Sequence, residues 1–108
     1  MNTISVVFAD HHPLVRSGVR ATLALENDLE LVAEAQNGQE ALSLIKMHRP
    51  DVFLFYLNTP GLHPLETVQE VQAVSTQTKL VVLAPPNEAT LIYPMVRAGI
   101  AGYLLEHE

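Results

Sequence analysis

The chain has 108 residues, the length of a single domain, and 48% of them are hydrophobic, which is enough to fill a core. Because it contains no cysteine, disulfides, thiolate metal ligands and a cysteine nucleophile are excluded. The net charge is −6, from 6 basic against 12 acidic residues, and it argues against direct nucleic-acid binding by this chain, because phosphate contacts need clustered Lys and Arg.

The first three predicted elements are a strand, a helix and a second strand. Residues 4–9, ISVVFA, are short, β-branched and apolar on both faces, which is typical of a central parallel strand. Pro13 suits the first turn of the helix that follows. The apolar stripe of this helix is expected to comprise Leu14, Gly18, Val19, Leu23 and Leu25. Residues 29–35, LELVAEA, alternate in polarity and predict an edge strand.

A second helix and a third strand follow. Asn37 is a good N-cap, and the helix is expected to stop at the His-Arg-Pro of residues 48–50. Its apolar face is expected to comprise Ala41, Leu42, Leu44, Ile45 and Met47. Residues 51–57, DVFLFYL, predict the third strand, and the Asn-Thr-Pro-Gly at 58–61 predicts a turn.

Two further helices and two further strands complete the chain. Apolar residues at helical spacing predict a helix over 64–74, and KLVVLA at 79–84 predicts a fourth buried strand. Residues 102–105, GYLL, predict a fifth strand after the fourth helix.

The fourth helix is expected to be irregular. Asn87 is predicted to cap it, and we expect it to run to Arg97 and to end at Gly99. Pro94 lies inside this pattern, where it removes a hydrogen bond and clashes with the preceding turn, at about 3 kcal/mol in a regular helix. We therefore expect the helix to be kinked, shortened or displaced.

Strands that alternate with helices predict an α/β fold with a doubly wound parallel sheet and right-handed connections. A single domain is predicted over residues 1–108. No stretch approaches the roughly 18 uninterrupted apolar residues of a membrane span, and no basic segment precedes the first apolar run. The sequence therefore predicts a cytoplasmic protein with neither a membrane helix nor a signal peptide.

Five blocks of the sequence, in order, resemble the receiver domain of bacterial response regulators, most closely the type that precedes a LuxR-like DNA-binding domain. They are VVFADHHPLVRSGVRATL, AEAQNGQEAL, RPDVFLFYLNTPG, KLVVLA and RAGIAGYLLE. The resemblance implies a flavodoxin-like, CheY-like fold with strand order 2-1-3-4-5, in which ligands bind outside the carboxyl ends of the strands. The family continues with a fifth helix and usually a DNA-binding domain. We therefore expect a domain truncated after the fifth strand, with an apolar face of the sheet left bare.

The resemblance also implies phosphoryl transfer from a histidine kinase to an aspartate, with Mg²⁺ held by an acidic pair and the nucleophile. Two positions of that site are retained in this sequence. Asp10 matches the first acid of the pair, and Asn58 keeps the backbone carbonyl that would complete the metal shell.

Four other positions of the site carry a different residue. His11 stands in place of the second acid, and Tyr56 in place of the phospho-accepting aspartate. Ala84 replaces a Thr or Ser that contacts the phosphoryl group, and Glu106 replaces a Lys. Because none of these residues can do the original work, we expect a degenerate phosphorylation site without a catalytic residue, without the usual Mg²⁺ and without another metal or cofactor.

Other interpretations of these residues were weighed. Tyr56 could accept a phosphate on its phenol, but its ring is better suited to capping the end of the strand. Asp10, His11 and His12 could ligate Zn²⁺, but adjacent histidines are seldom both ligands and no further Cys or His completes the set by spacing. His11 and Glu106 could contact each other and hold the site closed without phosphate.

The leading interpretation is a pseudo-receiver, a module that is not an enzyme and that acts in two-component signalling and transcription regulation through protein contacts. Its expected partner is another protein or a second copy, bound at the bare sheet face and the fourth-helix region. One alternative is a receiver competent for phosphotransfer with unorthodox acceptor chemistry, and another is a stand-alone dimerising module without a signalling input. A third is a flavodoxin-like enzyme or sensor, which the absence of a Gly-rich loop after the first strand disfavours.

Overall fold

The five strands expected from the sequence pair side by side as one parallel sheet in the order β2-β1-β3-β4-β5. The computed structural model describes residues 3–105. The strands are β1 (Ile4–Ala9), β2 (Leu29–Ala35), β3 (Val52–Tyr56), β4 (Lys79–Ala84) and β5 (Gly102–Leu105). The predicted flavodoxin-like topology is confirmed.

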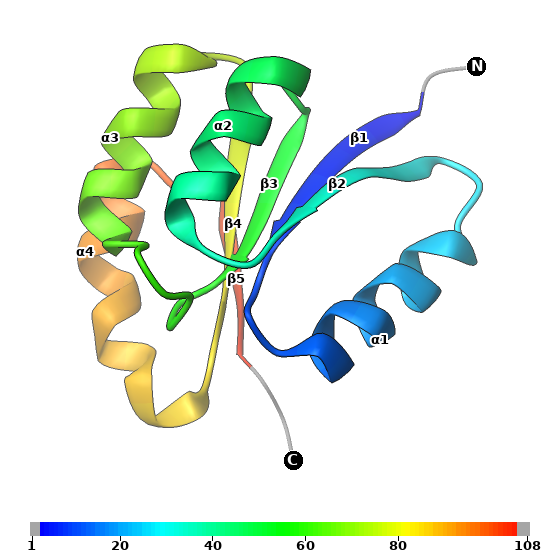
Figure 1. Cartoon of the computed structure of the whole chain (residues 1–108). Helices are drawn as coiled ribbons and strands as arrows, with labels where there is room; N and C mark the ends of the chain where they lie inside the picture. The colour runs from blue at the N-terminus through cyan, green and yellow to red at the C-terminus, as the bar shows by residue number, and fades with distance from the viewer. Residues whose placement is uncertain (1–2, 106–108) are drawn as a thin grey trace.

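The helices are distributed unequally over the two faces of the sheet (Figure 1). They are α1 (Pro13–Ala24), α2 (Gly38–His48), α3 (Pro64–Val74) and α4 (Ile92–Ala98), the last preceded by a 3₁₀ helix, η1 (Pro86–Leu91). In Figure 1, α2, α3 and α4 cover one face, and α1 lies on the other. None of the helices in residues 3–105 is both long and apolar enough to cross a bilayer.

This asymmetry is visible in the burial of the strands, because successive side chains point to opposite faces. Phe53 and Phe55 of β3 are fully buried on the face covered by three helices, and their rings stack with centroids 4.9 Å apart. On the other face, Leu54 and Leu83 are only partly buried, and Leu104 of β5 is 55% exposed. The face that carries α1 is therefore incompletely covered within residues 3–105.

The stripe predicted for α1 is confirmed in part, because Gly18, Val19 and Leu23 line the groove against the sheet. Leu14 and Leu25 are 88% and 83% exposed, and no residue of α1 is fully buried. The prediction of Leu14 and Leu25 is therefore wrong, and Val15, which was not predicted, lines the groove with Val19 and Leu23. A rotation of about 100° separates successive residues of a helix, so Val15 faces the sheet where Leu14 points to solvent. The prediction that Met47 lies on the apolar face of α2 is also wrong, since its side chain is 74% exposed.

An ion pair joins α1 to the edge strand. The guanidinium of Arg20 donates from Nε and Nη2 to the two carboxylate oxygens of Glu34 on β2, at 2.6 and 2.9 Å. This hydrogen bonding, with the charge of Glu34, raises the pKa of Arg20 above its ordinary value. This ion pair links α1 to β2, and the Arg20 side chain remains exposed.

The irregularity expected around Pro94 is confirmed as a shortened helix. α4 starts only at Ile92, so Pro94 lies in its first turn, where a backbone N–H has no partner within the helix and its loss is tolerated. The predicted cap at Asn87 is wrong, because Asn87 lies inside η1, which begins at Pro86 without a side-chain cap. Gly99 ends α4 with φ of 113°, as predicted.

Candidate functional site

The candidate site lies where the carboxyl ends of β1, β3 and β4 meet. Asp10 follows β1 directly, and Tyr56 and Ala84 are the last residues of β3 and β4. The strand register pairs Ala9 with Phe55, which places Asp10 beside Tyr56 at the sheet edge. This is the edge at which parallel α/β sheets bind their ligands.

Asp10 is completely buried although its side chain is a carboxyl group. Its Oδ1 accepts a hydrogen bond from the backbone N–H of His12 at 3.1 Å and lies 2.9 Å from Nδ1 of the His12 ring. Its Oδ2 is buried and has no hydrogen-bond partner among the described residues. A buried carboxylate oxygen without a partner is costly, which makes Asp10 the most unusual polar group of the site.

Two imidazole rings cover Asp10 on its solvent side. The rings of His11 and His12 lie 3.9 Å apart between centroids, and their side chains are 41% and 50% exposed. His11 Nδ1 lies 3.7 Å from Asp10 Oδ1. The rings of His12 and Tyr56 form a T-shaped contact, with their centroids 6.0 Å apart. His12 therefore connects Asp10 with Tyr56, a role that the sequence analysis had not predicted.

The remaining predicted positions are less closely connected. Asn58 is exposed in the loop after β3, and Ala84 is fully buried and carries no hydroxyl. Glu106 lies outside the described residues, and so does the predicted contact between His11 and Glu106.

Thr59 is a site-shaping residue that the sequence analysis did not single out. Its side chain is buried, and its Oγ1 lies 2.7 Å from the carbonyl oxygen of Tyr56 and 3.2 Å from that of Ala9. One hydroxyl thus ties the end of β3 to the end of β1. A threonine in the turn directly after a predicted strand is the signal that could have identified it.

The loop after β3 is also fixed by the start of α2. The backbone N–H of Gly38 donates to the carbonyl of Pro60 at 2.8 Å. A Cβ atom on Gly38 would lie 2.2 Å from the carbonyl oxygen of Gly61, so only glycine allows this approach. Gly61 itself has φ of 70°, in the left-handed region that favours glycine. These contacts fix the conformation of the loop after β3. The loop therefore keeps a defined geometry with Tyr56 at the end of the strand.

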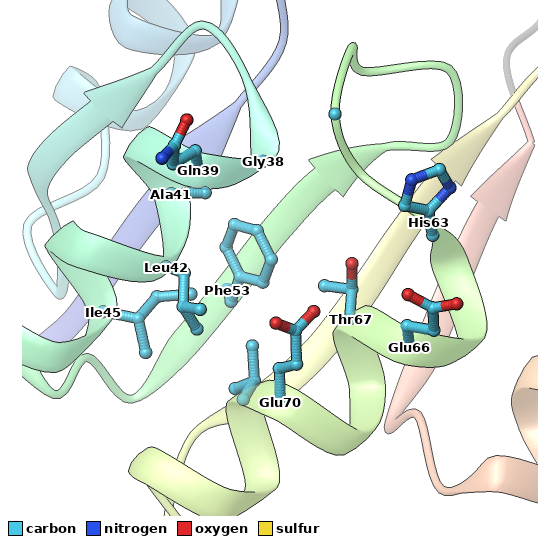
Figure 2. A pocket seen from close by; sticks show the side chains of 12 residues that line it. Gly38, Gln39, Ala41, Leu42, Ile45, Phe53, His63, Glu66, Thr67 and Glu70 are labelled. Atoms are coloured by element: carbon cyan, nitrogen blue, oxygen red, sulfur yellow. The ribbon is translucent and has the colours of Figure 1, made fainter.

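A second hollow lies between α2 and α3, with a volume of about 260 Å³. Figure 2 shows Glu66, Thr67 and Glu70 of α3 on one side of it, with Phe53 of β3 and residues of α2 on the other. Its carboxylates, those of Glu66 and Glu70, come from α3, and its apolar groups come from the core. No nucleophile with an adjacent base is apparent among its lining residues.

Comparisons with known proteins are consistent over most of the chain. A family model for the response regulator receiver domain matches residues 6–106. The probable transcriptional regulatory protein NarL of Mycobacterium tuberculosis is 35% identical over 103 residues, which are 95% of this chain and 48% of that protein. The nitrate/nitrite response regulator protein NarL of Escherichia coli is 31% identical over 102 residues, which are 94% of this chain and 47% of that protein.

Solved structures show the same likeness. The signal receiver domain of NarL from Mycobacterium tuberculosis superposes with a TM-score of 0.90 at 33% identity, over all of this chain and 87% of that one. The receiver domain of the response regulator AraT from Geobacillus stearothermophilus gives a TM-score of 0.85 at 28% identity, over 96% of this chain and 81% of that one. The chain spans about half the length of the curated relatives that it matches.

Proposed function

The chain belongs to the response regulator receiver domain family, and from this premise we propose that it is a degenerate receiver that works without aspartyl phosphorylation. It acts through protein–protein contacts in the regulation of transcription. The observation that carries the proposal is Tyr56, which occupies the end of β3, where the family has its phospho-accepting carboxylate.

The chemistry of the neighbouring residues supports this proposal. Mg²⁺ prefers hard oxygen ligands in octahedral geometry, and at the family's acidic positions only Asp10 supplies a carboxylate. His11 offers an imidazole there, and Ala84 offers no hydroxyl to a phosphoryl group. The tight loop after β3 is retained by Thr59 and Gly38, so the framework of the site persists while its phosphotransfer groups do not.

The contacts that replace phosphorylation are proposed to use the incompletely covered sheet face. There, an apolar groove of about 400 Å³ lies between α1 and the sheet, and we call it the α1–sheet groove. It is lined by Val15, Gly18, Val19, Thr22, Leu23, Leu54, Leu83 and Leu104. Burying such a surface is favourable at about 25 cal/mol per Å², so a protein partner or a second copy would stabilise it.

A second contact surface is proposed near α4. Tyr93 and Val96 of α4 are 67% and 46% exposed, and Tyr103 of β5, which lines the same shallow hollow, is 50% exposed. Aromatic side chains in such positions are common at interface cores. Tyr103 and Leu104 are successive residues of β5, so the two surfaces lie on opposite faces of the sheet and are proposed as separate contact sites.

Self-association through the α1–sheet groove is expected to be sensitive to charge. The native chain is expected to form a dimer whose fraction rises with concentration. The variant Leu104→Glu should stay monomeric, because the new carboxylate would be desolvated in the contact. Multi-angle light scattering over a range of protein concentrations measures the change. Met47→Glu on the opposite side of the fold is the control and should leave the dimer intact. A native chain that stays monomeric at all concentrations would contradict the homodimer.

The relatives named above are transcriptional regulatory proteins, and no enzymatic role is proposed for this chain. By analogy, it would serve as the cytoplasmic input domain of such a regulator, in which another part of the protein contacts DNA. The net charge of −6 supports a division of labour in which this chain binds protein and not nucleic acid.

A further inference from the structure

We propose that Asp10, His11 and His12 form a binding site for a borderline-soft divalent cation of the Zn²⁺ type, in place of the family's Mg²⁺ site. The proposal concerns this end of the sheet only and does not depend on the partner contacts above. It rests on two independent observations, the convergence of three ligand atoms and the unpartnered oxygen of a buried carboxylate.

The first observation is the position of the three ligand atoms. One from each residue, they all lie within 4.8 Å of one another. Nδ1 of His12 and Nδ1 of His11 lie 2.9 and 3.7 Å from Oδ1 of Asp10. Tetrahedral Zn²⁺ with bonds of about 2.0–2.1 Å places its ligand atoms roughly 3.3 Å apart, so the two distances bracket the required value. Small rotations of two exposed rings would complete the geometry.

Sequence adjacency had argued against both histidines as ligands, and the backbone removes that objection. His12 is extended, with φ of −90° and ψ of 112°, as the N-cap of α1. The centroids of the two rings lie 3.9 Å apart and their planes are tilted by 41°, and both Nδ1 atoms approach the same carboxylate oxygen. Two neighbouring residues can therefore reach one ion.

The second observation is the state of the Asp10 carboxylate. Its side chain has no exposed surface, and Oδ2 lacks a hydrogen-bond partner among residues 3–105. A buried anionic group of this kind is stabilised when it is paired with a cation. The backbone N–H of His12 fixes Oδ1, in the manner of the outer hydrogen bonds that orient metal ligands.

The donor set selects the kind of cation. Two imidazole nitrogens and one carboxylate oxygen suit Zn²⁺, Ni²⁺ or Cu²⁺, whereas Mg²⁺ demands oxygen ligands. Three protein ligands leave further coordination positions for water or for a group from a partner. The exposed sides of His11 and His12 provide the entry path.

Isothermal titration calorimetry tests the site in the chelator-treated full chain with ZnCl₂, with MgCl₂ as a second titrant. We expect one Zn²⁺ per chain and no heat from Mg²⁺. His11→Gln and His12→Gln should each weaken Zn²⁺ binding about tenfold or more. His48→Gln, at the exposed end of α2, is the matched control and should bind as the native chain does.

Thermal unfolding gives a second readout that guards against misfolded variants, because a ligand that binds only the folded state raises Tm. Zn²⁺ should raise Tm of the native chain and of His48→Gln, but not of a chain that carries both His11→Gln and His12→Gln. Absence of Zn²⁺ binding by the native chain, or undiminished binding by that double variant, would overturn the proposal. Either failure would leave the phosphorylation-independent role to be judged by its own experiment.

Discussion

Replacing Gly38 by alanine is expected to lower the free energy of unfolding by about 2–3 kcal/mol, in the range of overpacked buried sites. The added Cβ would meet the carbonyl oxygen of Gly61 at 2.2 Å and Cα of Leu62 at 2.9 Å. Both are backbone atoms that cannot move aside as a side chain would. Relief of the contact would also break the hydrogen bond from Gly38 to Pro60, which fixes the loop after β3. Urea denaturation followed by circular dichroism measures the loss.

Gly18→Ala is the matched control for that experiment. Gly18 lies inside α1, and a Cβ there would have no atom within 4 Å apart from its chain neighbours and the backbone of its own helix. Since glycine costs a helix interior about 0.5–1 kcal/mol relative to alanine, this variant should gain stability. If both variants behave alike, the loop is not held by the close approach of Gly38.

Tyr56→Asp is expected to lower the free energy of unfolding by about 3 kcal/mol more than Tyr56→Asn in metal-free buffer. The introduced carboxylate would stand beside buried Asp10. Two like charges roughly 5 Å apart at an effective dielectric constant of about 20 repel by about 3 kcal/mol. Because the two variants have nearly the same shape, their difference isolates the charge. Equal stabilities would show that position 56 does not face Asp10.

The same pair of variants should respond differently to Mg²⁺. Millimolar Mg²⁺ should raise Tm of Tyr56→Asp, since two carboxylates again flank a site for a hard cation. It should leave Tm of the native chain and of Tyr56→Asn unchanged. A Mg²⁺ response in the native chain would contradict the proposal that its Mg²⁺ site is lost.

Much of the fold could be predicted because the strands are strongly marked. Runs such as residues 4–9 and 79–84 are apolar and short, and the structure places β1 and β4 on those residues. Helix faces were harder to predict from spacing alone. On α1, valines and leucines occur on more than one side, and only packing against the sheet decides that Val15 turns inward and Leu14 outward. Local capping rules likewise missed the 3₁₀ helix that precedes α4.

The position of the strand-end residues was predictable, and the contacts between them were not. The residues at the ends of β1, β3 and β4 follow from strand order, since parallel strands end at one edge. The hydrogen bond from His12 to Asp10 and the hydroxyl of Thr59 between two strand ends depend on loop conformation. Spacing carries no information about such loop geometry, which is why the convergence of Asp10, His11 and His12 was not predicted from sequence.

The central claim is that this receiver fold does not accept a phosphoryl group on the aspartyl pathway. Intact-mass spectrometry after incubation of the native chain with a small phosphodonor and Mg²⁺ tests it most directly. The account predicts an unchanged mass, because the end of β3 carries Tyr56 in place of a carboxylate. A native chain that gains the mass of one phosphoryl group, when Asp10→Asn does not, would contradict it.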